Sequence, residues 1–208
     1  VEKLESSADK VFTPLGDGKM VWHLWGSGKP LVLLHGGSGS WSHWVKNIEA
    51  LSGHYRLLVP DLPGLGSSDS PPFFFDSKDY GASVPKLAET ISLGISSILG
   101  NTAFHLCGFS FGSIVGSYIA ADVKMRLLSF TLVGASAFGW PWQGLKTPFL
   151  SMTSKMTEQE RLDVQKLNLS NAMLTSEVGY DLARLQLNNV SRARLRTHLV
   201  TETNVLIS

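Results

Sequence analysis

The chain has 208 residues, which is enough for one ordinary domain or for part of a larger one. Its 18 Lys and Arg nearly balance its 17 Asp and Glu, which disfavours a nucleic-acid-binding protein held by phosphate contacts. The hydrophobic content of 43% argues against disorder, and the single cysteine excludes a scaffold of internal disulfides. No leader peptide is visible, so we expect a cytoplasmic protein.

Three short apolar runs near the N-terminus predict strands, at Val11–Leu15, Met20–Trp25 and Pro30–His35. Glycine-containing turns separate them, Gly16-Asp17-Gly18 before the second run and Gly26-Ser27-Gly28 before the third. Such turns are typical of hairpins. We therefore expect the chain to open with three antiparallel strands.

From His35 onward, predicted helices alternate with predicted strands. This alternation indicates an α/β fold with a mostly parallel central sheet and helices on both faces. The predicted helices are Trp41–Leu51, Ser83–Leu99 and Gly112–Lys124, and the predicted strands are Tyr55–Pro60, Ala103–Phe109 and Leu127–Val133.

One uncharged stretch, Ala103–Ala121, approaches the length of a membrane-spanning helix. Glycine and serine residues interrupt it, and neither a basic flank nor an aromatic belt frames it. A buried strand that runs into a buried helix explains it better than a membrane span.

The composition becomes more polar and helical in pattern in the last third of the chain. Thr157 and Glu160 predict a capping box at the start of a helix, and Ser176 is predicted to begin another. The Arg-rich run that follows is interpreted as a solvated helix face rather than an anion site. We expect residues 1–139 to form an α/β core and residues 140–208 to form a helical cap and the chain end.

The pattern Gly-x-Ser-x-Gly occurs at Gly108–Gly112, between a predicted strand and a predicted helix of small residues. A sharp strand–serine–helix turn requires little bulk two residues on either side of the serine. Such a turn exposes the hydroxyl of Ser110, and the following helix N-terminus stabilises nearby negative charge. Ser110 is therefore a candidate nucleophile, and the alternative is a serine with a purely structural role in a tight turn.

A second glycine-rich segment, LHGGSGSW at Leu34–Trp41, directly follows a predicted strand. Without side chains at Gly36 and Gly37, a backbone N–H can approach a reacting carbonyl oxygen, and two such donors make an oxyanion hole. We predict the donors to be the N–H groups of Gly37 and Phe111. The alternative is a phosphate-binding loop, but neither G-x-x-x-x-G-K-[ST] nor G-x-G-x-x-G fits the sequence.

The segments LLHGGSGSW, VPDLPGLGSSD and GFSFGS, in this order and spacing, resemble the α/β-hydrolase fold superfamily. They are most similar to its cap-bearing members, namely small esterases, epoxide hydrolases and the carbon–carbon hydrolases of aromatic meta-cleavage products. The resemblance covers about Val11–Gly139, and residues 140–200 resemble the lid of those enzymes. It implies Ser110 as the nucleophile, with oxyanion donors at Gly37 and Phe111. It also implies structural roles for three polar residues of these motifs, His35, Asp61 and Asp69.

The rest of the catalytic triad is not evident. A serine nucleophile needs a histidine base and an orienting carboxylate, which in this family follow later strands. After Ser110 the only histidine is His198, which no strand or Gly turn precedes, and no acid there follows an apolar strand. We expect a fold truncated before its last two strands, inactive as these 208 residues alone. A natural truncated paralogue is the alternative to a fragment.

The sequence predicts a serine hydrolase for an ester or related carbonyl substrate, with no metal and no cofactor. One alternative is carbon–carbon bond hydrolysis of a diketone, and another is a non-catalytic ligand-binding or interaction domain. Several aromatic residues suggest a small apolar or aromatic substrate, although aromatic side chains in a core would give the same pattern. They are Trp41, Phe109, Phe111, Trp140 and Trp142.

Overall fold

The computed structural model describes residues 1–73, 80–122, 126–135, 147–174, 177–195 and 197. The chain divides into two compact units. The first is Val1–Trp140 together with Ala193–Ser208, and the second is Pro141–Arg192. The second unit covers much of the range predicted as the cap, whereas the segment from Ala193 onward groups with the first unit.

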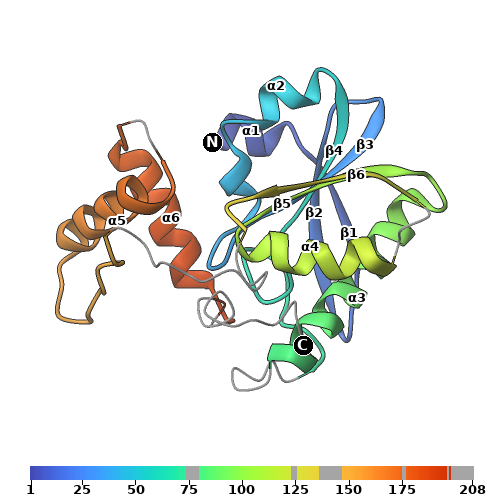
Figure 1. Ribbon diagram of the computed structural model, residues 1–208. Helices are drawn as coiled ribbons and strands as arrows, with labels where there is room; N and C mark the ends of the chain where they lie inside the picture. The colour runs from blue at the N-terminus through green and yellow to red at the C-terminus, as the bar shows by residue number, and fades with distance from the viewer. Residues whose placement is uncertain (74–79, 123–125, 136–146, 175–176, 196, 198–208) are drawn as a thin grey trace. The chain divides into compact units, whose positions relative to one another are not determined.

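The first unit is built on a six-stranded sheet with the order β1-β2-β4-β3-β5-β6 (Figure 1). Strands β4, β3, β5 and β6 run parallel, and β1 and β2 are antiparallel to their neighbours. The prediction of a mostly parallel sheet is confirmed. The strands are β1 (Asp9–Leu15), β2 (Gly18–Trp25), β3 (Lys29–Leu34), β4 (Tyr55–Pro60), β5 (Phe104–Phe109) and β6 (Leu127–Val133).

The prediction of three consecutive antiparallel strands is only half right. β1 and β2 do form a hairpin, closed at Gly16, whose φ is +59°. β3, however, does not pair with β2, because β4 lies between them. The turn after β2 contains glycine because of close packing, not because it closes a hairpin: a Cβ at Gly26 would overlap the carbonyl oxygens of Ser52 and Tyr55. This turn carries the chain past β4 instead of back along β2.

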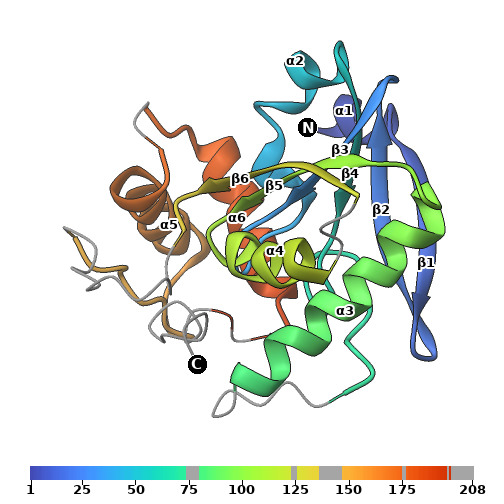
Figure 2. The ribbon, with the colours of Figure 1, turned by 45° about the vertical axis from the view of Figure 1, so that its right-hand side comes forward.

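Helices cover both faces of the sheet. Figure 2 shows α3 (Tyr80–Leu99) and α4 (Phe111–Asp122) side by side on one face. The alternation of strand side chains sends Val32, Leu34 and Leu58 into the core beneath these two helices. A second core, which includes Leu33, Leu57 and three tryptophans, occupies the other face with α2 (Ile48–Ser52). A short α1 (Glu2–Ser6) precedes the sheet.

The continuous helix predicted over Trp41–Leu51 is wrong. The structure has a single 3₁₀ turn, η1 (Trp41–Trp44), and then the separate α2. The side chains of Trp41, Trp44 and Ile48 are all buried, and their spacing of three and four residues matches a helical period. Burial therefore follows a helical period here, although the backbone between the two segments is not helical.

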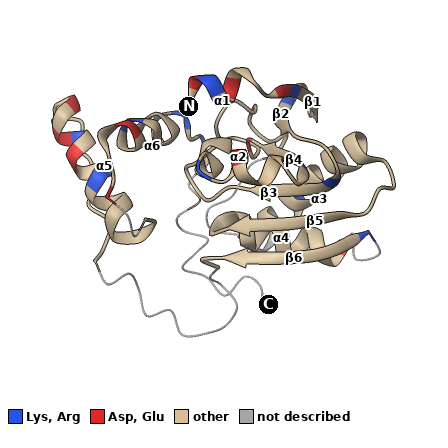
Figure 3. Cartoon of the chain, turned by 90° about the horizontal axis from the view of Figure 1, so that it is seen from above, with Lys and Arg blue, Asp and Glu red and all other residues tan. Residues whose placement is uncertain are grey.

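Strand β6 is an edge strand of the sheet, and its side chains are largely exposed. Leu128, Leu132 and Val133 each keep more than two fifths of their surface accessible. Neither β5 nor β6 contains a charged residue, so both are drawn entirely in tan in Figure 3. No helix in the described part of the chain combines the length and hydrophobicity needed to cross a lipid bilayer. The stretch considered for a span forms β5 and α4.

The second unit contains two helices, α5 (Glu158–Ala172) and α6 (Tyr180–Arg192). The predicted capping box at the start of α5 is confirmed: Thr157 Oγ1 accepts from the Glu160 N–H, and Glu160 Oε2 accepts from the Thr157 N–H at 2.7 Å. Tyr180 Oη donates to Asp163 Oδ1 at 2.7 Å and so links the two helices. The predicted start at Ser176 lies outside the described residues.

Candidate active site

Ser110 lies in the sharp turn between β5 and α4. Its φ of +51° is in the left-handed region, which non-glycine residues rarely adopt. The Ser110 N–H donates to the Val133 carbonyl at 2.8 Å, and its own carbonyl accepts from the Ser113 N–H at 2.8 Å. These backbone bonds hold a strained residue in place. Such strain is typical of functional sites.

The two glycines of the Gly-x-Ser-x-Gly pattern are required by close backbone packing. A Cβ at Gly108 would lie 2.5 Å from the Gly112 carbonyl oxygen. A Cβ at Gly112 would overlap the carbonyl oxygens of Leu34 and His35 at the end of β3. The turn therefore presses α4 against β3 and β5, and no residue with a side chain fits at either position.

Helix α4 begins at Phe111, directly after Ser110. The first N–H groups of a helix have no acceptor within it, so they and the helix dipole favour negative charge beside Ser110. Inside the turn, Ser113 Oγ donates to the Gly108 carbonyl and ties the first turn of α4 back to β5. The helix N-terminus is thus fixed relative to the serine.

The loop after β3 meets this turn, because β3 and β5 are parallel neighbours that pair Leu34 with Gly108. A Cβ at Gly36 would lie 3.3 Å from Ser110 Cβ, and a Cβ at Gly37 would lie 3.8 Å from Phe111 Cβ. The structure thus brings together Ser110, Gly37 and Phe111.

His35 holds this loop by hydrogen bonds through both ring nitrogens. The Leu62 N–H donates to His35 Nε2 at 2.9 Å, so the ring proton is on Nδ1, which donates to the Gly36 carbonyl at 2.8 Å. His35 is fully buried, and burial lowers its pKa despite the opposing effects of the Asp61 charge and the Gly36 carbonyl. A neutral ring with both nitrogens occupied supports the loop and is not available as a base.

His43 is a loop contact that the sequence analysis did not single out. The Gly36 N–H donates to His43 Nδ1 at 3.2 Å. The ring packs edge-on against Phe109, with centroids 5.6 Å apart, and leaves no room for a Cβ at Gly39. Because the Gly36 N–H already donates to His43, it is a poor candidate to bind a substrate oxygen, and the next N–H along the loop is that of Gly37. The sequence signal would have been a histidine between two buried tryptophans, Trp41 and Trp44.

Asp61 fixes the start of η1 and the loop after β4. Oδ1 accepts from the Trp41 N–H at 2.8 Å and Oδ2 accepts from the Ser67 N–H at 2.9 Å. Burial raises the pKa of Asp61, but interactions with His23, His35 and these two N–H groups outweigh burial and lower it. Asp61 is therefore an ionised structural residue.

The rest of this loop is attached to β2. Asp69 Oδ2 accepts from the Lys19 N–H at 2.8 Å, and Ser68 Oγ accepts from the Val21 N–H at the same distance. These bonds agree with the structural role that the resemblance implied for Asp69.

Two of the aromatic residues considered for a substrate pocket are core residues. Phe111 is fully buried, and Trp41 packs against Trp25 with ring centroids 5.4 Å apart. Phe109 is partly accessible. Trp140 and Trp142 lie outside the described residues.

The structure does not supply the remaining triad members within its described part. No histidine or carboxylate there forms a hydrogen bond with the Ser110 side chain, and His198 lies outside the described residues. No group of histidine, cysteine and acidic side chains suited to a metal is found among them either.

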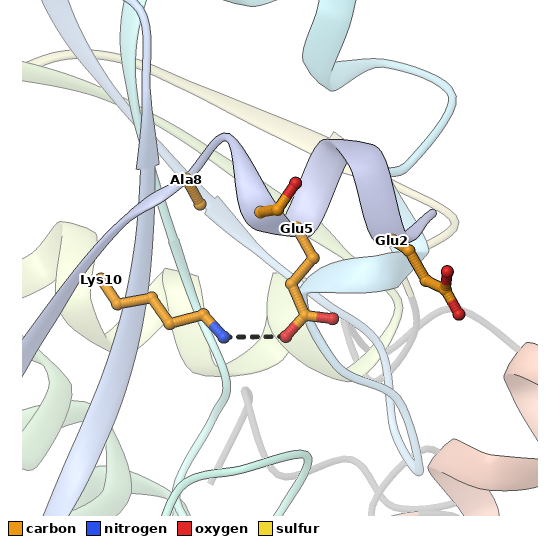
Figure 4. Close-up of a pocket in the computed structure, with 5 residues that line it drawn as sticks. Glu2, Glu5, Ala8 and Lys10 are labelled. Atoms are coloured by element: carbon orange, nitrogen blue, oxygen red, sulfur yellow. Dashed lines mark hydrogen bonds and ion pairs between the residues drawn. The ribbon is translucent and has the colours of Figure 1, made fainter.

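A surface pocket near the N-terminus is lined by residues that are distant in sequence from Ser110 and its neighbours. Figure 4 shows it beside α1, with Lys10 Nζ 2.8 Å from Glu5 Oε1. Both side chains are exposed, and an exposed ion pair contributes little to stability. The lining residues are Glu2, Glu5, Ser6, Ala8 and Lys10, which include no member of the candidate site.

Comparisons with known proteins find hydrolases among the relatives of this chain. The chain is 27% identical over 175 residues to the pimeloyl-[acyl-carrier protein] methyl ester esterase of Vibrio parahaemolyticus, which covers 82% of this chain and 64% of that protein. It is 38% identical over 97 residues to a soluble epoxide hydrolase of a Corynebacterium species, covering 47% and 31%. The chain thus spans less than two thirds of the length of these relatives.

Solved structures lead to the same fold. The crystal structure of a putative lipase from Acinetobacter baumannii AYE matches all of this chain and 68% of that one, with a TM-score of 0.71 and 21% identity. The epoxide hydrolase CorEH matches 62% of this chain and 43% of that one, with a TM-score of 0.54 and 29% identity. The sequence model of the alpha/beta hydrolase fold family matches residues 29–171. With this match over more than half of its length and a mostly parallel sheet, the chain belongs to the α/β-hydrolase fold family.

Proposed function

We propose that this protein is a serine hydrolase of esters or related carbonyl compounds, with Ser110 as its nucleophile. The observation that carries the proposal is the left-handed backbone of Ser110, at a strand–helix turn that packs against the glycine loop after β3. A purely structural serine in a turn has no reason to adopt a strained conformation beside both a helix N-terminus and a second glycine loop.

In the proposed reaction, Ser110 Oγ bonds to the substrate carbonyl carbon while the C=O π electrons move onto the oxygen. The N–H groups of Gly37 and Phe111 donate to this oxyanion. The hydroxyl proton passes to a histidine oriented by a carboxylate, which we place outside the described residues. Collapse of the intermediate expels the protonated leaving group, and water hydrolyses the acyl-serine. One oxyanion donor contributes about 10²- to 10³-fold to kcat.

Serine chemistry favours a carbonyl substrate over an epoxide, despite the likeness to epoxide hydrolases. A serine that opened an epoxide would form an ether, which water does not readily cleave. An acyl-serine is an ester, and the same oxyanion hole that formed it assists its hydrolysis. Phe109, partly accessible beside Gly36, supports a substrate with an apolar or aromatic group near the carbonyl.

Hydrolysis assays test this proposal on the protein at its natural length. We expect turnover of p-nitrophenyl esters and no turnover of an epoxide, and we expect Ser110→Ala to lose the activity while the far-UV circular dichroism is unchanged. A diketone substrate assayed in parallel tests the carbon–carbon alternative. Ester turnover that persists in Ser110→Ala would refute the nucleophile assignment.

A further inference from the structure

A buried hydroxyl from the far end of the chain lies against the candidate oxyanion loop. Thr197 is only 1% exposed, and its Oγ1 has no hydrogen-bond partner among the residues that the structure describes. Buried hydroxyl groups are normally paired, because an unpaired one loses its bonds to water without replacing them. This unpaired hydroxyl therefore requires an explanation.

The hydroxyl faces Gly37. A Cβ built on Gly37 would overlap Thr197 Oγ1, and the same position is 3.8 Å from Phe111 Cβ. Thr197 thus lies beside Gly37, one of the two residues proposed to donate to the oxyanion, and Phe111 approaches the same glycine. A neutral hydroxyl is a suitable third donor, since it can donate a hydrogen bond without giving up its proton.

The residues before Thr197 are attached to the loop after β4. The Arg194 N–H donates to the Gly64 carbonyl at 2.9 Å, and the Arg194 guanidinium donates to the Ser68 carbonyl. Leu195 is buried against Gly64, where a Cβ would lie 2.7 Å from Leu195 Cγ. These contacts anchor the chain just before Thr197. They therefore help to fix the position of Thr197 beside Gly37.

We propose that the Thr197 hydroxyl donates a third hydrogen bond to the substrate oxygen held by Gly37 and Phe111, an inference that rests on the proposed function. The hydroxyl, which has no partner among the described residues, gains a charge-assisted hydrogen bond when the oxygen becomes an oxyanion. Because that bond is strongest in the transition state, it raises kcat more than it lowers KM. The competing explanation is that Thr197 only fills space with its methyl group.

Replacing Thr197 by valine separates the two explanations, because valine keeps the shape and removes the hydroxyl. We expect Thr197→Val to lower kcat for an ester by about 10- to 100-fold with little change in KM. The affinity for a boronic acid that mimics the tetrahedral intermediate falls by the same factor. Thr197→Ser retains the hydroxyl and most of the activity.

Thr13→Val is the matched control. Thr13 is 2% exposed, but its Oγ1 accepts from Trp22 Nε1 at 2.9 Å. Thr13→Val therefore lowers Tm and leaves kcat unchanged, whereas Thr197→Val removes an unpaired buried hydroxyl and leaves Tm equal or higher. This pair of substitutions separates a loss of stability from a loss of catalysis.

The outcomes distinguish this inference from the function on which it rests. Wild-type kcat and boronate affinity in Thr197→Val would overturn the inference and leave the nucleophile proposal intact. A fall in Tm as large as that of Thr13→Val would overturn it too, since the hydroxyl would then be paired. A wild-type protein that neither hydrolyses esters nor binds the boronate would overturn both proposals.

Discussion

Gly112→Ala tests whether the serine turn depends on the close packing of α4 against β3. Gly112 is helical, so alanine by itself would favour the helix by about 1 kcal/mol. Its Cβ, however, would lie 2.7 Å from the Leu34 carbonyl carbon and overlap two carbonyl oxygens. These are backbone atoms of the last residue of β3 and of the residue after it, and β3 pairs with a strand on each side, so α4 must move instead.

Overpacking of this kind costs about 1–3 kcal/mol, and we take the upper value because the contact is with backbone. The net loss is then about 2 kcal/mol, or about 4–8 °C in Tm for a chain of this size. Thermal unfolding of Gly112→Ala measures this loss. Gly53→Ala is the control: Gly53 has a φ of −68° and the nearest atom to its Cβ position is 3.7 Å away, so Tm should be unchanged or slightly higher. Equal Tm values for the two variants would refute the packing argument.

Four further substitutions test the loops around Ser110. Asp61→Asn lowers stability at neutral pH. Because folding lowers the pKa of Asp61, its contribution is fully present above about pH 4 and is lost as the pH falls through the lowered folded-state pKa, so the difference between variant and wild type in urea denaturation should shrink steadily as the pH falls below about 4. His43→Leu removes the acceptor of the Gly36 N–H and lowers kcat by about 10-fold, and an unchanged kcat would contradict this. Gly37→Val crowds the substrate oxygen and lowers kcat by about 10²-fold, whereas near-normal turnover would place the donor elsewhere. Leu132→Lys, on exposed β6, reduces any self-association of the 208-residue chain in size-exclusion chromatography while leaving Tm within about 1 °C.

The serine turn could be predicted from the sequence because its requirements are local. Gly108 and Gly112 each stand where a side chain would strike backbone, and Ser110 lies between an apolar strand and a small-residue helix. The sheet was predictable for the same reason, since each strand is a short apolar run. His35 was also assigned correctly, because a histidine between a strand and a glycine pair is surrounded by backbone groups.

Features that depend on distant parts of the chain could not be predicted. The turn at Gly26 looks like a hairpin locally, and only the pairing of β2 with β4 shows that it is not one. The burial period of Trp41, Trp44 and Ile48 does not reveal that the helix is interrupted. Thr197 has no local signal at all, because its significance comes from packing against Gly37 at the other end of the chain.

Covalent labelling of the protein at its natural length with a fluorophosphonate probe tests the central claim most directly. We predict that mass spectrometry of the digested protein finds the phosphonyl group on Ser110. Ser113, whose Oγ donates to the Gly108 carbonyl in the same turn, serves as an internal control and should remain unlabelled. Labelling at another serine, or equal labelling of Ser110→Ala, would contradict the assignment of Ser110 as the nucleophile.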